Sequence, residues 1–180
     1  IDTYYSLVAK EAVVAGASIV NDISAGSMDA EMISTVASLN VPYVLMHMQG
    51  TPQTMQNEPV YENVTKEILD FFIQKTAEFK KAGIKDIVVD LGFGFGKTIQ
   101  HNFELLRNLS VFKMLNCPVL LGISRKSFIY KTLNVSVEDS LNGTTALHFA
   151  GLTNGASILR VHDVKEAVET IELISAYQHH

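Results

Sequence analysis

Five short segments of this 180-residue chain share one pattern, and that pattern constrains the fold more than any other feature. Each segment is mostly apolar, as in a strand that is buried on both faces of a parallel sheet. Each also ends in polar residues and is followed by a stretch with helical periodicity. Polar groups at the carboxyl ends of alternating strands are typical of a (β/α) barrel, which places its site there. The five segments are residues 18–24, 42–48, 86–92, 118–126 and 157–163.

Segments with helical periodicity separate the predicted strands. Gly16 and Gly83 follow two of these segments, where glycine suits the left-handed cap of a helix. A loop rich in Gln, Thr and Pro covers 49–60. The predicted strands are 18–23, 42–47, 86–91, 118–123 and 157–162. The predicted helices are 3–15, 29–39, 61–81, 101–114, 127–132, 137–151 and 164–177.

The start of the chain has the pattern of a strand's end. Ile1 and Asp2 directly precede a helical pattern, and the chain does not open with Met. Together with the five segments this makes about six βα units, whereas a full eight-unit barrel typically needs ~250 residues. We therefore predict one α/β domain over 1–178, an incomplete (β/α)8 TIM barrel that lacks its N-terminal two units. His179 and His180 are interpreted as the remnant of a purification tag.

Composition narrows the functional classes. The chain is 47% hydrophobic and 18% charged, with a formal net charge of −5. An acidic chain without a basic run is a poor candidate for nucleic-acid binding. No apolar stretch approaches the ~20 residues that span a bilayer, so no membrane partner is expected. Cys117 is the only cysteine, which excludes an intrachain disulfide and fits a cytoplasmic location.

Asp90 closes one predicted strand and precedes a loop that contains Gly92, Gly94 and Gly96. A carboxylate there can accept two parallel hydrogen bonds from the N–H edge of a guanidine-like heterocycle. The alternative is a loop aspartate that caps the next helix. We favour the heterocycle, because the neighbouring strand ends are polar too.

The same glycine-rich loop does not fit a phosphate-binding P-loop. That motif needs a glycine five residues before Gly96, where the chain has Leu91. We interpret the loop instead as an aromatic wall, in which Phe95 rather than Phe93 packs on a flat substrate.

Cationic side chains follow the last two predicted strands. Arg125 and Lys126 lead into a helix, and Arg160 and His162 end the final strand, where alternation points both to one face. Barrel enzymes often bind phosphate at these loops. A phosphate or pyrophosphate site is therefore predicted. The alternatives are that Arg125 only pairs with a surface acid and that His162 is structural.

Side-chain alternation decides which residues point into the barrel. It sends only one of Asn21 and Asp22 inward, and an asparagine there suits an amide-like ring edge. Val20, Val44 and Val89 are also expected to point inward. Met46 and His47 are ambiguous, since both residue types are commonly core residues. The scattered histidines form no recognisable metal motif, so no metal ligand is predicted within the chain.

Taken together, these residues resemble the dihydropteroate synthase family. The similarity extends over essentially the whole chain to about residue 177. The motifs are short, but their number, order and spacing are specific. The matching stretches are Ile1-Asp2-Thr3, Asn21-Asp22-Ile23, residues 45–50, residues 90–98, Ser124-Arg125-Lys126-Ser127 and Arg160-Val161-His162-Asp163.

The resemblance implies a (β/α)8 barrel and a transferase reaction of folate biosynthesis. The family condenses 6-hydroxymethyl-7,8-dihydropterin pyrophosphate with p-aminobenzoate and releases pyrophosphate, with Mg²⁺ as cofactor. The resemblance is compatible with a homodimer. These small molecules are the partners that we expect.

The resemblance also assigns roles to residues of this sequence. Lys126, Arg160 and His162 match the catalytic cations, and Arg160 and His162 match the pyrophosphate-binding pair. Phe95 and Ser127 match parts of the p-aminobenzoate pocket. The pterin-binding positions are Asp2, Asn21, Met46, Asp90, Lys126 and Arg160.

Two departures from the family pattern bear on activity. Leu91 stands where the family usually has proline, and the two N-terminal units that carry further substrate-binding and metal-binding loops have no counterpart here. The fragment alone is therefore expected to have little activity. The alternatives are a methyltetrahydrofolate-binding methyltransferase domain, which would not need the cation cluster, and a non-catalytic pterin-binding barrel.

Overall fold

The computed structural model describes residues 1–50 and 59–179, and its strands form one parallel sheet in chain order. Every neighbouring pair of strands is parallel. Asp2 adds an isolated parallel bridge to Asn21, as expected of a strand end. This confirms the α/β class and the wall of a barrel. The strands are β1 (Val20–Asp22), β2 (Tyr43–Met46), β3 (Ile87–Asp90), β4 (Val119–Leu121) and β5 (Ile158–Leu159).

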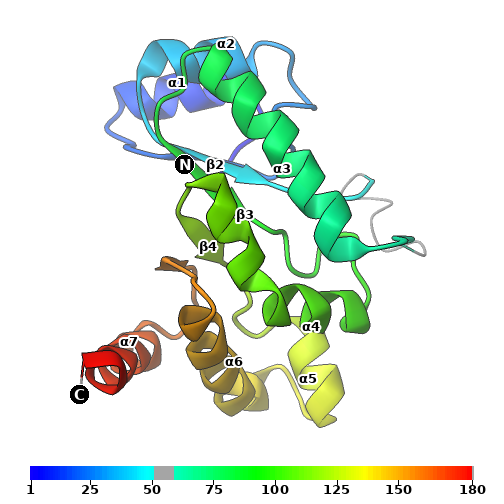
Figure 1. Cartoon of the computed structure of the whole chain (residues 1–180). Helices are drawn as coiled ribbons and strands as arrows, with labels where there is room; N and C mark the ends of the chain where they lie inside the picture. The colour runs from blue at the N-terminus through cyan, green and yellow to red at the C-terminus, as the bar shows by residue number, and fades with distance from the viewer. Residues whose placement is uncertain (51–58, 180) are drawn as a thin grey trace.

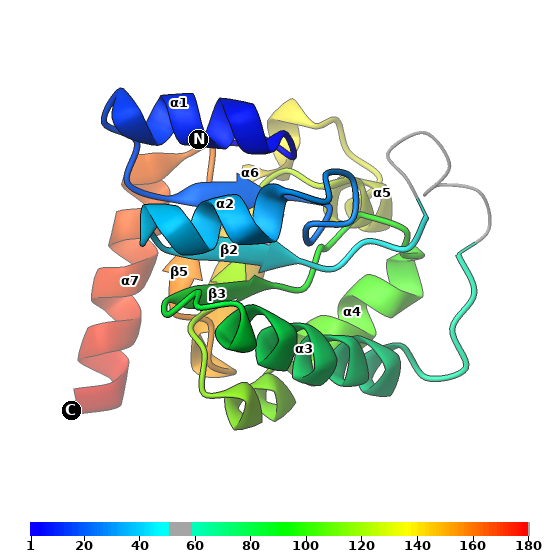
Figure 2. The same cartoon turned by 90° about the horizontal axis from the view of Figure 1, so that it is seen from above.

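Helices surround the curved sheet on its outer side (Figures 1 and 2). The last helix continues to His179, and His180 lies outside the described residues. The predicted loop 49–60 lies mostly outside them too. The α-helices are α1 (Ser6–Val14), α2 (Met32–Leu39), α3 (Val64–Lys81), α4 (Ile99–Arg107), α5 (Ser127–Leu133), α6 (Leu141–Thr153) and α7 (Val164–His179). The 3₁₀ helices are η1 (Leu109–Leu115) and η2 (Glu138–Ser140).

Helix α3 shows how local sequence fixes an element. The Asn63 side chain accepts a hydrogen bond from the Lys66 N–H, and Glu67 accepts one from the Asn63 N–H. These bonds satisfy N–H groups at the start of the helix that have no intrahelical partner. Ile68 and Phe72, four residues apart, are fully buried on the face toward the sheet.

The sheet has a helix-facing side and an interior side. Tyr43 packs against Phe79 of α3, with ring centroids 5.2 Å apart, so Tyr43 points outward. Its register partner Val20 and the buried Val89 belong to the same outer core. The prediction that Val20 and Val89 point into the barrel was therefore wrong, because the inward-facing position lies one residue away along each strand. Val44, one position along from Tyr43, faces the interior as predicted.

Most predicted elements are found with slightly different bounds, and three differ in more than their bounds. The helix expected at 101–114 is divided at Asn108, which ends α4 and precedes η1, and asparagine is a residue of low helix propensity. The segment 137–151 starts as η2 before α6. Strand β5 ends at Leu159, so strand alternation does not orient Arg160 and His162.

The two ends of the sheet leave apolar helix faces in solvent. In α1, Leu7 and Val14 are 68% and 75% exposed, and in α7, Leu173 and Tyr177 are 67% and 72% exposed. Helix α7 stands at the margin of the molecule in Figure 1. The middle strands are closely covered, whereas the flanks are not.

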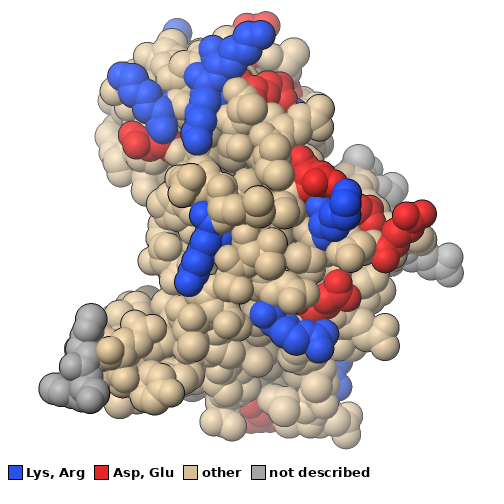
Figure 3. Space-filling model, viewed as in Figure 1, with Lys and Arg blue, Asp and Glu red and all other residues tan. Residues whose placement is uncertain are grey.

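Charged side chains of both signs are interspersed on the face shown in Figure 3. On α3, Lys66 pairs with Asp70 and Lys75 pairs with Glu78. None of the helices in residues 1–50 and 59–179 has the length and hydropathy needed to cross a bilayer.

Candidate active site

Asp90 lies at the carboxyl end of β3, on the interior side of the sheet. It is only 6% exposed, and its Oδ1 accepts a 2.8 Å hydrogen bond from the Gly92 N–H. Gly122 lies beside it, and a Cβ there would come within 3.7 Å of Asp90 Oδ2. The glycine therefore leaves room next to the carboxylate. The aspartate supports its own loop and still presents its second oxygen toward the barrel interior.

Burial dominates the electrostatics of Asp90. It raises the pKa of the carboxyl above its ordinary value, while Lys126, Lys97 and Arg160 lower it to a smaller extent. The carboxyl is therefore surrounded by cations that favour its ionised form. An ionised Asp90 would accept hydrogen bonds from a heterocyclic N–H edge.

Lys126 spans the space between two loops. It lies directly before α5, yet its Nζ donates a hydrogen bond to the Phe93 carbonyl in the loop after β3. The same Nζ lies 4.7 Å from the centre of the Phe95 ring. Burial lowers the Lys126 pKa to about 8, with Asp90 opposing the shift and Arg160 adding to it. A cation, an aromatic ring and the carboxylate thus come together at the mouth.

Arg160 connects the two ends of the chain across the barrel mouth. Its guanidinium lies 3.2 Å from the Asp2 carboxylate, and both side chains are largely exposed. The bridge between Asp2 and Asn21 puts Asn21 next to this pair, at the edge of the sheet. The structure therefore brings three predicted pterin-binding residues into one neighbourhood.

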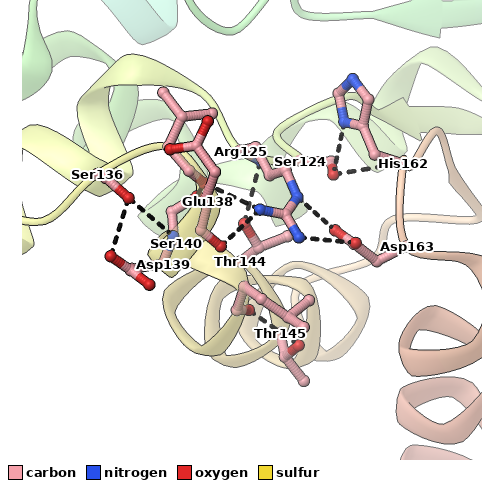
Figure 4. Close-up of polar contacts among 12 residues, drawn as sticks. Ser124, Arg125, Ser136, Glu138, Asp139, Ser140, Thr144, Thr145, His162 and Asp163 are labelled. Atoms are coloured by element: carbon pink, nitrogen blue, oxygen red, sulfur yellow. Dashed lines mark hydrogen bonds and ion pairs between the residues drawn. The ribbon is translucent and has the colours of Figure 1, made fainter.

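Side-chain contacts join the loop after β4 to the loop after β5 (Figure 4). Arg125 forms two 2.8 Å hydrogen bonds to Asp163, which lower the pKa of that carboxyl, and it also donates to the Val137 and Glu138 carbonyls. The alternative considered for Arg125, a pairing with an acid, is what the structure shows.

His162 is an exposed residue held by the loop after β4. Its backbone N–H and its Nδ1 lie 3.2 and 2.9 Å from the Ser124 hydroxyl oxygen. This contact keeps His162 on the same rim as Lys126. Its role in binding pyrophosphate stays a prediction.

Alternation separates Asn21 from Asp22. Asp22 points outward, where its carboxylate accepts hydrogen bonds from the Tyr43 hydroxyl and from the Ser24 and Gly26 N–H groups. Asn21 therefore faces the interior. Met46 is in register with Asp90 and is 3% exposed, so it lies beside the carboxylate in the floor of the mouth.

Ser127 starts α5 and is exposed. It borders a cavity of about 300 Å³ that Thr98, Asn102 and Lys131 also line. The structure thus gives Ser127 access to open space beside the Phe95 loop.

Lys97 and His47 were not among the predicted site residues. Lys97 is 6% exposed, and its Nζ lies 3.1 Å from His47 Nδ1. One feature of the sequence could have indicated Lys97. It follows a loop with several glycines, whose backbone carbonyl groups need hydrogen-bond donors. His47 gave only the ambiguous pattern of a strand-end histidine.

No metal site emerges from the chain as described. Within residues 1–50 and 59–179, His, Cys, Asp and Glu side chains do not gather in groups of three or more that could hold an ion. We therefore assign no Mg²⁺ ligand to this chain.

Comparison with known proteins shows which family shares this arrangement. The model of the family described as "Pterin binding enzyme" matches residues 1–162. The chain belongs to the pterin-binding enzyme family. Within that family it is 42% identical over 178 residues to the dihydropteroate synthase of Escherichia coli, covering 98% of this chain and 63% of that relative.

Solved structures of the same pterin-binding family agree. A dihydropteroate synthase from Stenotrophomonas maltophilia, with imidazole in its active site, matches with a TM-score of 0.96 and 36% identity over 99% of this chain and 68% of that one. The enzyme from Xanthomonas albilineans in complex with 7,8-dihydropteroate matches with a TM-score of 0.92 and 35% identity, over 99% and 64% of the two chains. The chain described here thus spans about two thirds of these relatives and shares their barrel fold.

Proposed function

We propose that this chain carries the pterin-binding part of a dihydropteroate synthase. The observation that supports this most is the buried Asp90, which lies beside Lys126 and Phe95 in a barrel of this family. The reaction joins 6-hydroxymethyl-7,8-dihydropterin pyrophosphate to p-aminobenzoate.

The pterin would bind edge-on to Asp90. Its 2-amino group and N3–H present two parallel donors, and an ionised carboxylate accepts such a pair well. Met46 would line one side of the ring, while Asn21 and Asp2 would contact further polar atoms. Lys126 would reach the O4 and N5 side of the pterin.

Bond formation would need little activation of the nucleophile. The aniline nitrogen of p-aminobenzoate attacks the methylene carbon of the pterin, the carbon–oxygen bond to pyrophosphate breaks, and the nitrogen loses a proton. Lys126, Arg160 and His162 would stabilise the charge that develops on the leaving pyrophosphate. Phe95 and Ser127 would orient the arylamine, and orientation supplies much of such a rate enhancement.

Mg²⁺ is part of this proposal as a cofactor that would neutralise charge on the pyrophosphate oxygens. Its protein ligands are expected in the part of the relatives that this chain does not span. A cytoplasmic location is likewise proposed, and a homodimer is the oligomeric state to test by sedimentation.

The cation cluster argues against the runner-up, a methyltetrahydrofolate-binding methyltransferase domain, which has no pyrophosphate to release. A non-catalytic pterin-binding barrel is the other alternative, and an assay of pyrophosphate release separates it from an enzyme.

Two measurements test the proposal. Calorimetry with a pterin ligand should detect binding to the chain, and a protein that also contains the part of the relatives that this chain does not span should release pyrophosphate from p-aminobenzoate and the pterin pyrophosphate. Binding without release would support the non-catalytic barrel. If the folded chain binds no pterin, the proposed function is wrong.

A further inference from the structure

Lys97 is a buried amine that the proposed reaction does not use. Its Nζ lies 2.9 Å from the Gly92 carbonyl oxygen, 3.0 Å from that of Phe95, and 3.1 and 3.4 Å from Nδ1 and the carbonyl oxygen of His47. An ammonium has three protons to donate. Lys97 can therefore bond to both ends of the loop after β3 and to the residue that follows β2.

His47 provides a fixed partner at the end of β2. Burial, helped by the Lys97 charge, lowers the His47 pKa to about 3, so the ring is neutral and one nitrogen can accept a hydrogen bond. The ring also packs edge-on against Phe71, with centroids 4.9 Å apart. Lys97 thus connects a loop to a well-packed side chain.

The backbone of the loop is shaped for this contact. Gly92 has a φ of +65°, and a Cβ at this position would collide with the His47 carbonyl oxygen. Only glycine permits such an approach. The loop therefore lies directly on the end of β2, within reach of Lys97.

Phe95 is held from two sides. Its carbonyl accepts a hydrogen bond from Lys97, while its ring lies below Lys126 Nζ. Lys126 also binds the Phe93 carbonyl, and Asn102 Oδ1 accepts a 2.7 Å hydrogen bond from the Gly94 N–H. The Phe95 N–H also donates to the Gly92 carbonyl, 3.0 Å away, and Lys97 donates to that same carbonyl. Lys97 is therefore the side chain that ties this turn of the loop, through the Phe95 backbone, to the end of β2.

We propose that Lys97 is a positioning residue for the arylamine pocket, because it holds the backbone of Phe95 against the end of β2. This inference rests on the proposed function, in which the Phe95 ring orients p-aminobenzoate. Lys97 borders the same cavity as Ser127, but its Nζ is engaged by the loop carbonyls and by His47, so it would act through the Phe95 backbone. Its loss should change arylamine binding more than pterin binding, because Asp90 and Met46 lie on the strands themselves and Asp90 keeps Lys126, the cation that lowers its pKa most.

Electrostatics supports a positioning role over simple packing. Burial lowers the Lys97 pKa to about 7, with Asp90 opposing that shift and Lys126 adding to it. Burying an amine costs free energy that an apolar side chain of the same length would avoid. The cost is offset only where the amine makes its hydrogen bonds, and here those bonds order the loop.

The test compares the whole chain with Lys97→Met and with a matched control, Lys85→Met. Lys85 is an exposed lysine just before β3, at the opposite end of the same strand. For Lys97→Met we expect the dissociation constant for p-aminobenzoate, measured with a pterin bound, to rise about tenfold while that for the pterin changes by less than about twofold. Amide hydrogen exchange should accelerate in residues 92–96 and not in the core strands. Lys85→Met should behave like the unmodified chain.

Lys97→Gln keeps two hydrogen-bond donors without the charge. Its affinities and its exchange rates should lie between those of the unmodified chain and those of Lys97→Met. This variant also provides the test if Lys97→Met does not fold. The proposal is overturned if loop exchange stays slow in both variants, or if exchange and both affinities change together across the barrel. If the unmodified chain binds neither ligand, the proposed function fails, but hydrogen exchange still decides whether Lys97 holds the loop.

Discussion

The loop after β3 and the paired loops after β4 and β5 form neighbouring parts of the barrel mouth and are stabilised in different ways. The first is held from below by Lys97, a buried amine whose pKa is lowered to about 7. The others are joined by Arg125 and Asp163, whose side chains are 22% and 20% exposed. Arginine stays charged at any ordinary pH and lysine in a dry site does not. The two regions should therefore respond differently to substitution and to pH.

Lys126 belongs to both regions, so its replacement should have the largest effect. In Lys126→Met the Phe93 carbonyl loses its donor and the leaving pyrophosphate loses a cation. Removal of one such donor commonly costs ~2.7–4 kcal/mol, about a hundredfold to a thousandfold in rate. Pyrophosphate release by a protein that also contains the part of the relatives not spanned here measures it, with Lys126→Arg as the charge-retaining comparison and the exposed Lys165→Met as control. A rate within about threefold of the unmodified chain would remove Lys126 from the reaction.

Asp90 belongs to the first region alone, and Asp90→Asn should mainly weaken pterin binding. A hydrogen bond to a charged group is worth ~1.5–3 kcal/mol, or roughly tenfold to more than a hundredfold in the dissociation constant. The control is Asp86→Asn, at the start of the same strand. An unchanged dissociation constant in the Asp90 variant would show that the pterin does not bind at β3.

The two regions should also differ in how they make the unfolding free energy depend on pH. The folded-state pKa of Lys97 lies below its ordinary value of 10.5, so between about pH 7 and 10.5 the unfolded chain binds more protons than the folded chain. The unfolding free energy should therefore rise with pH in that window, by about 2 kcal/mol between pH 7 and 9. Chemical denaturation of Lys97→Met should lack this part of the rise. If both proteins show the same pH profile, Lys97 does not titrate in that range.

Disrupting the second region should have the smallest effect, and the effect should not depend on pH. Arg125→Met removes the link to Asp163 and should let the loops that carry Lys126 and His162 move apart. We expect about a tenfold lower rate of pyrophosphate release, with the same ratio at pH 6 and pH 9. Arg125→Lys should restore only part of the rate, because lysine cannot form the two-bond pairing. A ratio that changes with pH would show that the two regions are coupled.

Much of the fold follows from local sequence. Strand positions, the parallel order and the polar strand ends were predicted because an apolar run and its flanking residues report on burial within one element. For the same reason the predicted site residue Asp90 was found at the end of β3, Arg160 directly after β5, and Lys126 in the loop that follows β4. Their roles toward a substrate stay predictions.

The sequence by itself determined the barrel architecture and the family, because both depend on short-range periodicity and on motifs in a fixed order. The tertiary structure alone decided that Arg125 turns away to meet Asp163, 38 residues later, and that Lys97 reaches His47, 50 positions before it. It also decided that Val20 and Val89 face the helices rather than the barrel interior. These outcomes depend on which distant groups lie within hydrogen-bonding or packing distance, and on how deeply each ionisable group is buried. A local sequence pattern does not contain that information.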